Sequence, residues 1–273
     1  VDFLAVDEKS MSCLHLTALG GFFAAFQFLF LERKVPANSK NSYGDLPCHI
    51  AAKKGHVDIL RLLFENGEFY ADAENKAMHK PIHLAAIFGR LAVMELLVEK
   101  RLPPDSLNCD QLSAAHLAAY NGHLPIMRFL VKKGAQLDIR NKYGNTPAHM
   151  AALRDRVDIL KFLHSEKADL NTKNSHRLTP IEAAHVEECQ GAVDFLMKAL
   201  HLDADRQGQA SVKVSLSDED NRLMQLMQEP SEDILREHAK RARSIFHTDF
   251  TPLGKLEPGY VRVPFSSIFN RAI

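Results

Sequence analysis

The chain has 273 residues, of which 46% are hydrophobic and 25% charged, and its 34 Lys and Arg balance 34 Asp and Glu. A balanced charge argues against a dedicated nucleic-acid surface, which needs an excess of Lys and Arg. Four cysteines are too few for a disulfide scaffold and favour a reducing compartment, so we expect an intracellular protein, with the cytoplasm favoured over the nucleus.

The N-terminal region raises the question of a membrane helix. The segment 14–31 is long and apolar enough to span a bilayer, being interrupted only by His15, Thr17 and Gln27. No signal-peptide pattern precedes it. The glycines Gly20 and Gly21 fall at a turn of the repeat described next, so we interpret the segment as two short helices of a buried terminal repeat and expect no membrane insertion.

A short box of the form small-or-Pro, x, His, x, Ala recurs along the chain. Its copies start at residues Ser12, Leu46, Lys80, Ser113, Thr146 and Thr179, which lie 34, 34, 33, 33 and 33 residues apart. A Pro at the start of four of the six boxes (Pro47, Pro81, Pro147 and Pro180) favours a first helical turn, and the Ala pairs that follow are good helix formers. A glycine ends each of the first four boxes, at Gly21, Gly55, Gly89 and Gly122, and permits the positive φ of a tight turn. A second apolar stretch with helical spacing follows each turn.

This unit resembles the ankyrin repeat, a β-turn finger followed by two antiparallel helices. The resemblance covers residues 7 to about 200 and implies an all-α solenoid of about six repeats, starting near residues 7, 41, 75, 108, 141 and 174. Met78 and Gln111 stand where the finger usually has Gly, so we expect distorted turns there. The last copy has Glu182 in place of His, which indicates that the array ends near this copy.

Five histidines recur once per repeat, at positions His15, His49, His83, His116 and His149. Stacked repeats would place them roughly 10 Å apart, which is too far for a shared ion held at about 2 Å per ligand. The family resemblance implies instead that they hydrogen-bond loops between neighbouring repeats. We expect no metal and no cofactor.

The two ends of the array differ from its middle. The second helix of the first repeat is rich in Phe, whereas a terminal repeat should present polar residues to water. Because the chain begins with Val, we expect missing N-terminal sequence to cover this surface; a folded-back C-terminal region and self-association through this first repeat are the alternatives. Residues 201–273 form a second region, in which we expect a helical cap (helices near 217–228 and 230–247) and an irregular tail that packs on the last repeats or on a partner.

Catalytic motifs are missing from the sequence. It holds no phosphate loop, HExxH, EF-hand loop or G-x-S-x-G elbow, and its cysteines have no CxxC spacing. We therefore predict no enzymatic activity.

If the solenoid forms, the fingers and first helices line a concave surface, and the residues that stacking does not need are candidates for binding. Several of these positions carry apolar or aromatic residues where solvated positions would be polar, which is typical of an interaction surface. The candidates for partner binding are Tyr43, His79, Ile87, Phe88, Leu112, Tyr120, Tyr143, Leu153 and Arg154.

The function favoured is a non-enzymatic module that binds a protein partner on this surface. Lys53, Lys54 and Arg154 would form a charged rim that favours an acidic, apolar peptide. Packing of the same side chains inside the array is the alternative for the site. For the whole protein, the alternatives are the recruiting or targeting segment of a larger enzyme or of a bacterial effector acting in a host cell, and a self-associating scaffold.

Overall fold

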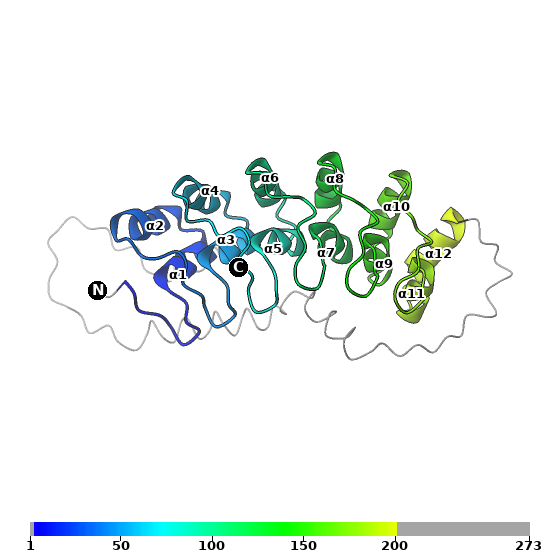
Figure 1. Cartoon of the computed structure of the whole chain (residues 1–273), viewed down its shortest axis with the longest axis horizontal. Coiled ribbons are helices and arrows are strands. Elements are labelled where there is room, and N and C mark those ends of the chain that lie inside the picture. The colour runs from blue at the N-terminus through cyan, green and yellow to red at the C-terminus, as the bar shows by residue number, and fades with distance from the viewer. Residues whose placement is uncertain (1–2, 201–273) are drawn as a thin grey trace, which may run out of the picture. The chain divides into compact units, whose positions relative to one another are not determined.

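The computed structural model describes residues 3–200, and these residues form a row of helix pairs (Figure 1). The first helix of each pair begins at the His-containing box and the second after the turn that follows it. In chain order the helices are α1 (Cys13–Gly20), α2 (Phe23–Gln27), the π-helical η1 (Phe28–Glu32), α3 (Pro47–Lys54), α4 (Val57–Glu65), α5 (Pro81–Ile87), α6 (Leu91–Glu99), α7 (Ala114–Asn121), α8 (Leu124–Lys132), α9 (Pro147–Ala152), α10 (Val157–Ser165), α11 (Pro180–Val186) and α12 (Gln190–Ala199).

The repeated box starts each first helix in the same way. In α3, α5, α9 and α11 the proline occupies the first turn, where its missing N–H is not needed. The backbone N–H of the N-cap residue donates to the Nδ1 atom of the histidine three residues later, as from Ser113 to His116 at 3.2 Å. In the sixth copy the N–H of Thr179 donates to the carboxylate of Glu182 at 2.7 Å. Glutamate therefore performs the same capping role but has no second N–H to donate onward.

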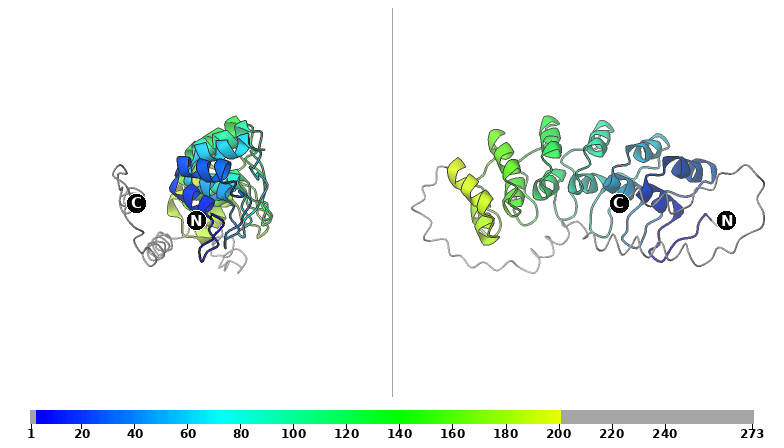
Figure 2. Two further views of the ribbon diagram at one scale, coloured as in Figure 1. Left: turned by 90° about the vertical axis from the view of Figure 1, so that its left-hand side faces the viewer. Right: turned by 180° about the vertical axis from the view of Figure 1, so that it is seen from behind.

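Stacking of the pairs produces two helical layers. First helices pack on first helices and second helices on second helices of the adjacent repeat, and each pair is also packed internally. Figures 1 and 2 show the two rows, with the finger loops projecting on the side of the first helices. The Ala pairs, such as Ala85 and Ala86, are fully buried in the first-helix layer, where their small size lets neighbouring helices approach. The predicted all-α ankyrin-type solenoid is confirmed.

The six fingers share one turn geometry. In the second finger the Oδ1 atom of Asn41 accepts the N–H groups of Tyr43 and Asp45, both at 2.9 Å, and the N–H of Gly44 donates to the carbonyl of Asn41 at 2.9 Å. Met78 and Gln111 make the same backbone hydrogen bond at 2.9 Å with φ values of 61° and 56°. The expectation of distorted turns at these two residues was wrong, because both side chains are accommodated in the left-handed conformation.

The first repeat divides the apolar segment 14–31 into separate helices. Gly21 has φ = 69°, so the chain turns between α1 and α2, and the second helix continues as the π-helical turn η1. The division of this segment into short helices of a repeat is thus confirmed, but the expectation that the repeat is buried was wrong for Leu19, Phe22, Phe23 and Phe28, which are exposed. Within residues 3–200, no helix combines the length and the apolar character required to cross a bilayer. The predicted helices and tail of residues 201–273 lie outside the described residues.

Candidate protein-binding surface

The repeated histidines bind backbone rather than metal. The Nε2 atom of each donates to a carbonyl of the following finger or of the loop that leads to it, as from His116 to Asn145 at 2.9 Å and from His149 to Leu178 at 3.0 Å. The remaining three act in the same way over 2.9–3.0 Å: His15, His49 and His83. This confirms the expectation from the family resemblance that the histidines link neighbouring repeats.

The environment of these rings keeps them neutral. Burial lowers the pKa of His83 to about 3 and those of His116 and His149 to about 4, and it also lowers the pKa values of His15 and His49. Because Nδ1 accepts a backbone N–H while Nε2 donates, a second ring proton would face another donor. Each repeated imidazole is therefore a neutral structural link.

A second set of polar links joins the fingers to one another. The Nδ2 atom of Asn75 donates to the carboxylate of Asp45 at 2.7 Å, and that of Asn174 donates to the side chain of Asn145 at 2.8 Å. His79 has the equivalent position opposite Asn108, with 3.5 Å between Nδ1 and Nδ2. His79 is buried in this ladder, so the expectation that it is available to a partner was wrong.

The ladder is interrupted between the fourth and fifth fingers. In this register Leu112 lies opposite Asn141, and it has no acceptor for the Asn141 amide. The Nδ2 atom of Asn141 is buried and has no hydrogen-bond partner, which agrees with an apolar neighbour at this point. Leu112 is fully buried and is therefore a core residue between fingers, contrary to the expectation that it belongs to an exposed patch.

The C-terminal ends of the first helices show a similar difference from expectation. Ile87 and Tyr120 were predicted to be exposed, but only 3% and 1% of their surfaces are accessible. The guanidinium of Arg154, from the next repeat, lies 5.0 Å from the centroid of the Tyr120 ring and covers it. The predicted apolar patch is therefore not continuous, because neighbouring repeats bury Ile87 and Tyr120 in its middle and make them part of the core.

Five of the nine predicted residues remain partly or fully exposed: Tyr43, Phe88, Tyr143, Leu153 and Arg154. The ammonium of Lys53 lies 4.8 Å from the centroid of the half-buried Phe88 ring, and that of Lys142 lies 4.9 Å from the Tyr143 ring. Lys142 also forms an ion pair with the buried Asp110 at 2.6 Å. The surface therefore consists of aromatic rings that contact cations, distributed over several repeats.

Met78 is an exposed apolar residue that the sequence interpretation assigned only to a distorted turn. Its side chain is 40% exposed, and that of Tyr43 in the preceding finger is 46% exposed. The two fingers are joined by the hydrogen bond from the N–H of Lys76 to the carbonyl of Tyr43, at 2.9 Å. The sequence did contain a signal for this exposed residue, because a large apolar side chain stands at a finger position where the repeat usually has glycine.

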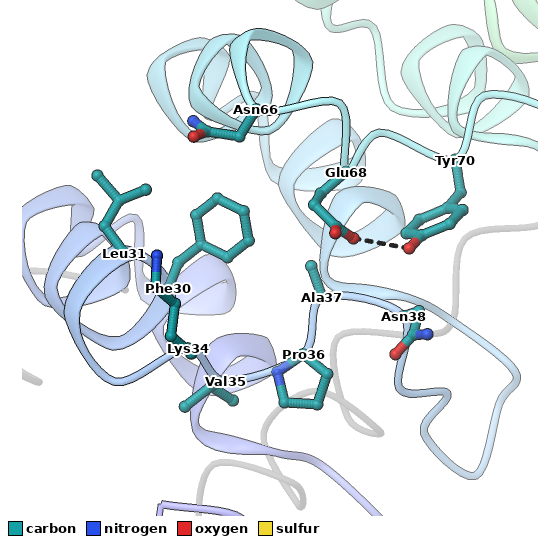
Figure 3. A pocket seen from close by; sticks show the side chains of 10 residues that line it. All are labelled: Phe30, Leu31, Lys34, Val35, Pro36, Ala37, Asn38, Asn66, Glu68 and Tyr70. Atoms are coloured by element: carbon teal, nitrogen blue, oxygen red, sulfur yellow. Dashed lines mark hydrogen bonds between the residues drawn. The ribbon is translucent and has the colours of Figure 1, made fainter.

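A pocket of about 390 Å³ lies elsewhere, where the segments that follow η1 and α4 meet (Figure 3). Its lining includes Phe30, Lys34 and Tyr70, and the Tyr70 hydroxyl donates to Glu68 at 2.7 Å. None of the nine predicted residues lines it. Among residues 3–200, no group of three or more His, Cys, Asp or Glu is arranged to hold a metal ion.

Comparison with known families agrees with this architecture. The family model described as ankyrin repeats (3 copies) matches residues 14–106, 82–174 and 115–210. The chain is an ankyrin-repeat protein. No curated protein matches this ankyrin-repeat protein at a significant level. Arrays of this family are generally protein-interaction modules without catalytic activity, and extended surfaces of solenoids are where such binding takes place.

Proposed function

We propose that this ankyrin-repeat protein is an intracellular, non-enzymatic adaptor that binds a protein segment on its finger side. The contacts proposed are Tyr43, Phe88, Tyr143, Leu153 and Arg154. These residues are accessible to a partner, whereas His79, Ile87, Leu112 and Tyr120 support them from within the array.

The observation that carries this proposal is the pair of cation–ring contacts at the ends of the first helices. Lys53 of the second repeat lies over Phe88 of the third, and Arg154 of the fifth repeat lies over Tyr120 of the fourth. A cation that stacks on a ring loses less conformational freedom when it binds a ligand. A guanidinium stacked through its face also retains N–H donors at its edge, which match a carboxylate.

The chemistry of the surface favours an acidic, apolar partner segment. Leu153 is a half-buried apolar residue next to the exposed Arg154 in the sequence, and the half-buried Phe88 contacts the ammonium of Lys53. Glu187 moderates this positive charge; burial raises the pKa of its carboxyl, and Arg154 opposes that shift. An extended peptide with carboxylates flanking an apolar side chain satisfies both kinds of contact.

The test compares wild type with the variants Phe88→Ala and Arg154→Glu. Candidate ligands come from a displayed peptide library selected on the wild-type chain. We expect each variant to weaken binding of the selected peptides by about 1–3 kcal/mol, because it removes an anchor or reverses a charge. Titration calorimetry measures the affinity, and thermal unfolding checks that the variants remain folded.

Arg128 provides a matched control on the other side of the array. It lies in α8, in the second-helix layer, and its guanidinium is 5.3 Å from the Phe162 ring. Arg128→Glu should therefore leave peptide affinity unchanged. Equal losses in Arg128→Glu and Arg154→Glu would refute the assignment of binding to the finger side.

A further inference from the structure

The first two repeats are each one residue longer than the repeats that follow. In the first repeat the additional residue lies in the second helix. The N–H of Val35 donates to the carbonyl of Leu29, six residues earlier, at 3.1 Å. In the next four repeats the corresponding bond spans five residues, as from Ala135 to Leu130 at 3.0 Å. The π-helical turn η1 absorbs the difference, and single π-helical turns occur frequently at functional sites.

In the second repeat the additional residue lies in the segment that follows α4. The finger residue Asn75 comes eight residues after Gly67, whereas Asn141 comes seven residues after the equivalent Gly134. Both longer segments line the pocket shown in Figure 3, which we name the junction pocket. Insertions into a repeat map to its loops, and loops on a rigid scaffold often carry binding functions.

Stacked aromatic rings hold the longer segment of the second repeat in place. The ring centroid of Phe69 lies 3.9 Å from that of Phe64 in the same repeat. Glu68 and Tyr70, on either side of Phe69 in the sequence, line the junction pocket. Figure 3 shows them across the pocket from the Phe30 ring. The polar groups of the second repeat are therefore held in position before a ligand binds.

This side of the junction pocket offers hydrogen-bond acceptors. The Tyr70 hydroxyl donates to the Oε2 atom of Glu68 at 2.7 Å, so the Oε1 atom of this carboxylate remains for a ligand. The Nδ2 atom of Asn66 donates to the carbonyl of Leu62 at 2.8 Å, so the side-chain oxygen of Asn66 remains as well. A carboxylate and an amide oxygen together suit an ammonium group, which has three N–H donors.

The segment that follows η1 supplies a cation and an apolar surface. Lys34 is exposed, and no ion pair or hydrogen bond joins its ammonium to another of the described residues. The buried side chains of Phe30, Val35 and Ala37 line the same space. Among the described residues of the lining, the charged ones are Lys34 and Glu68, so the junction pocket carries one charge of each sign.

We propose that the junction pocket binds a free α-amino acid with an apolar side chain. Glu68 and Asn66 accept the ammonium group of the ligand, and Lys34 pairs with its carboxylate. The side chain of the ligand packs on Phe30 and Val35. A zwitterion matches both charges of the pocket, whereas a simple cation or anion leaves one of them unpaired. The volume of about 390 Å³ is in the range of small-molecule sites.

The site is separate from the surface proposed for partner binding, because none of the proposed contact residues lines the junction pocket. Its ligand would touch segments of both the first and the second repeat. Binding should therefore stabilise the packing of these two repeats as well as fill the pocket.

The test uses the full chain with L-leucine as the probe. Titration calorimetry should show binding, and two analogues separate the contacts: leucinamide lacks the carboxylate, and N-acetyl-L-leucine lacks the ammonium group. Each should bind about 10-fold more weakly than leucine, because it leaves one charge of the pocket unpaired. Glycine should bind about 10-fold more weakly as well, because it has no apolar side chain to bury.

Two variants assign the contacts to residues. Glu68→Gln and Lys34→Met should each weaken leucine binding by about 10-fold, because each removes one charge-assisted hydrogen bond. The preference for leucine over leucinamide should be lost in Lys34→Met and retained in Glu68→Gln. Thermal unfolding without ligand checks that both variants are folded.

Matched controls come from residues outside the pocket. Lys167 has the position of Lys34 in the fifth repeat, with φ values of 61° and 54°, so Lys167→Met makes the same change in the same conformation. Glu65 is an exposed carboxylate of α4 that does not line the pocket. Lys167→Met and Glu65→Gln should bind leucine as the wild type does.

Three outcomes would overturn the proposal. One is a wild-type chain that shows neither heat of binding nor a shift in thermal unfolding with leucine at about 10 mM. Leucinamide that binds as tightly as leucine would indicate a site for organic cations instead of amino acids. Equal losses in Lys34→Met and Lys167→Met would show that the leucine binds outside the junction pocket.

Discussion

The two layers of the array are held together by different chemistry. In the described residues, every buried polar or charged residue lies in a finger or in the box at the start of a first helix, including His83, His116, Asn108 and Asn141. The buried residues of α4, α6, α8, α10 and α12 are all apolar. The finger layer thus depends on the geometry of hydrogen bonds, whereas the second-helix layer depends on the area removed from water.

This difference predicts that the finger layer is sensitive to charge and protonation, and that the second-helix layer is sensitive mainly to side-chain volume. It also supports placing the proposed binding surface on the finger side. Backbone that is held by side-chain hydrogen bonds can carry variable exposed residues without changing its path.

The largest expected effect is loss of stability in acid. The repeated histidines have folded-state pKa values below the ordinary value of 6.5, so their contribution is complete above pH 6.5 and is lost as the pH falls toward the folded value. Each histidine then removes up to about 1.4 kcal/mol of stability per pH unit, and His116, with its pKa at about 4, about 3 kcal/mol in total. Urea unfolding followed by circular dichroism between pH 7.5 and pH 5 should therefore show a steep decline.

Variants of the two layers sharpen this test. His116→Gln should flatten the dependence on pH, because it removes one of the titrating groups. Leu130→Ala, in the second-helix layer, should lower stability by about 2–5 kcal/mol at every pH without changing the slope. A stability that is flat between pH 7.5 and pH 5 in the wild type would show that the neutral histidines do not support the fingers.

A smaller effect is expected for a charge placed in the finger ladder. Asn75→Asp replaces a 2.7 Å hydrogen bond with two facing carboxylates, since the partner is Asp45. We expect a loss of about 2 kcal/mol in the free energy of unfolding at pH 7.5. The matched variant Asn174→Asp faces Asn145, whose amide can rotate to donate, and should lose less than about 1 kcal/mol. Equal losses in chemical denaturation would contradict the ladder.

The smallest expected difference concerns two glycines with left-handed conformations. Gly44 (φ = 77°) lies in a finger, and a Cβ atom there would be 2.8 Å from the backbone N of Lys76. Gly67 (φ = 71°) follows a second helix and has nothing within 4 Å of its Cβ position. Gly67→Ala should cost about 1 kcal/mol from backbone strain alone, and Gly44→Ala about 1 kcal/mol more because the fingers must separate. Thermal unfolding of the two variants compares them directly.

The local pattern of each repeat was sufficient to predict its helices and turns. Pro, His and Ala in the box, and glycine in the turn, specify the conformation of the residues next to them, and six copies in phase imply stacking. The histidine links to neighbouring loops followed from the family resemblance. The finger turns at Met78 and Gln111 were predicted less well, because the hydrogen bonds of Asn75 and Asn108 hold a conformation that the local residue disfavours.

For four of the nine candidate residues the exposure expected from the sequence was wrong, because the exposure of a side chain depends on neighbours that are distant in sequence. Tyr120 is covered by Arg154 from the next repeat, and Leu112 is fully buried although it lies in a finger. No pattern within one repeat contains that information.

By itself the sequence determined the period, the family and the place where each first helix begins, since the period is visible in the spacing of the boxes and the signals for a helix start lie within about four residues of it. Only the tertiary structure decided which apolar residues reach solvent, because packing between repeats brings together side chains that are some 30 residues apart.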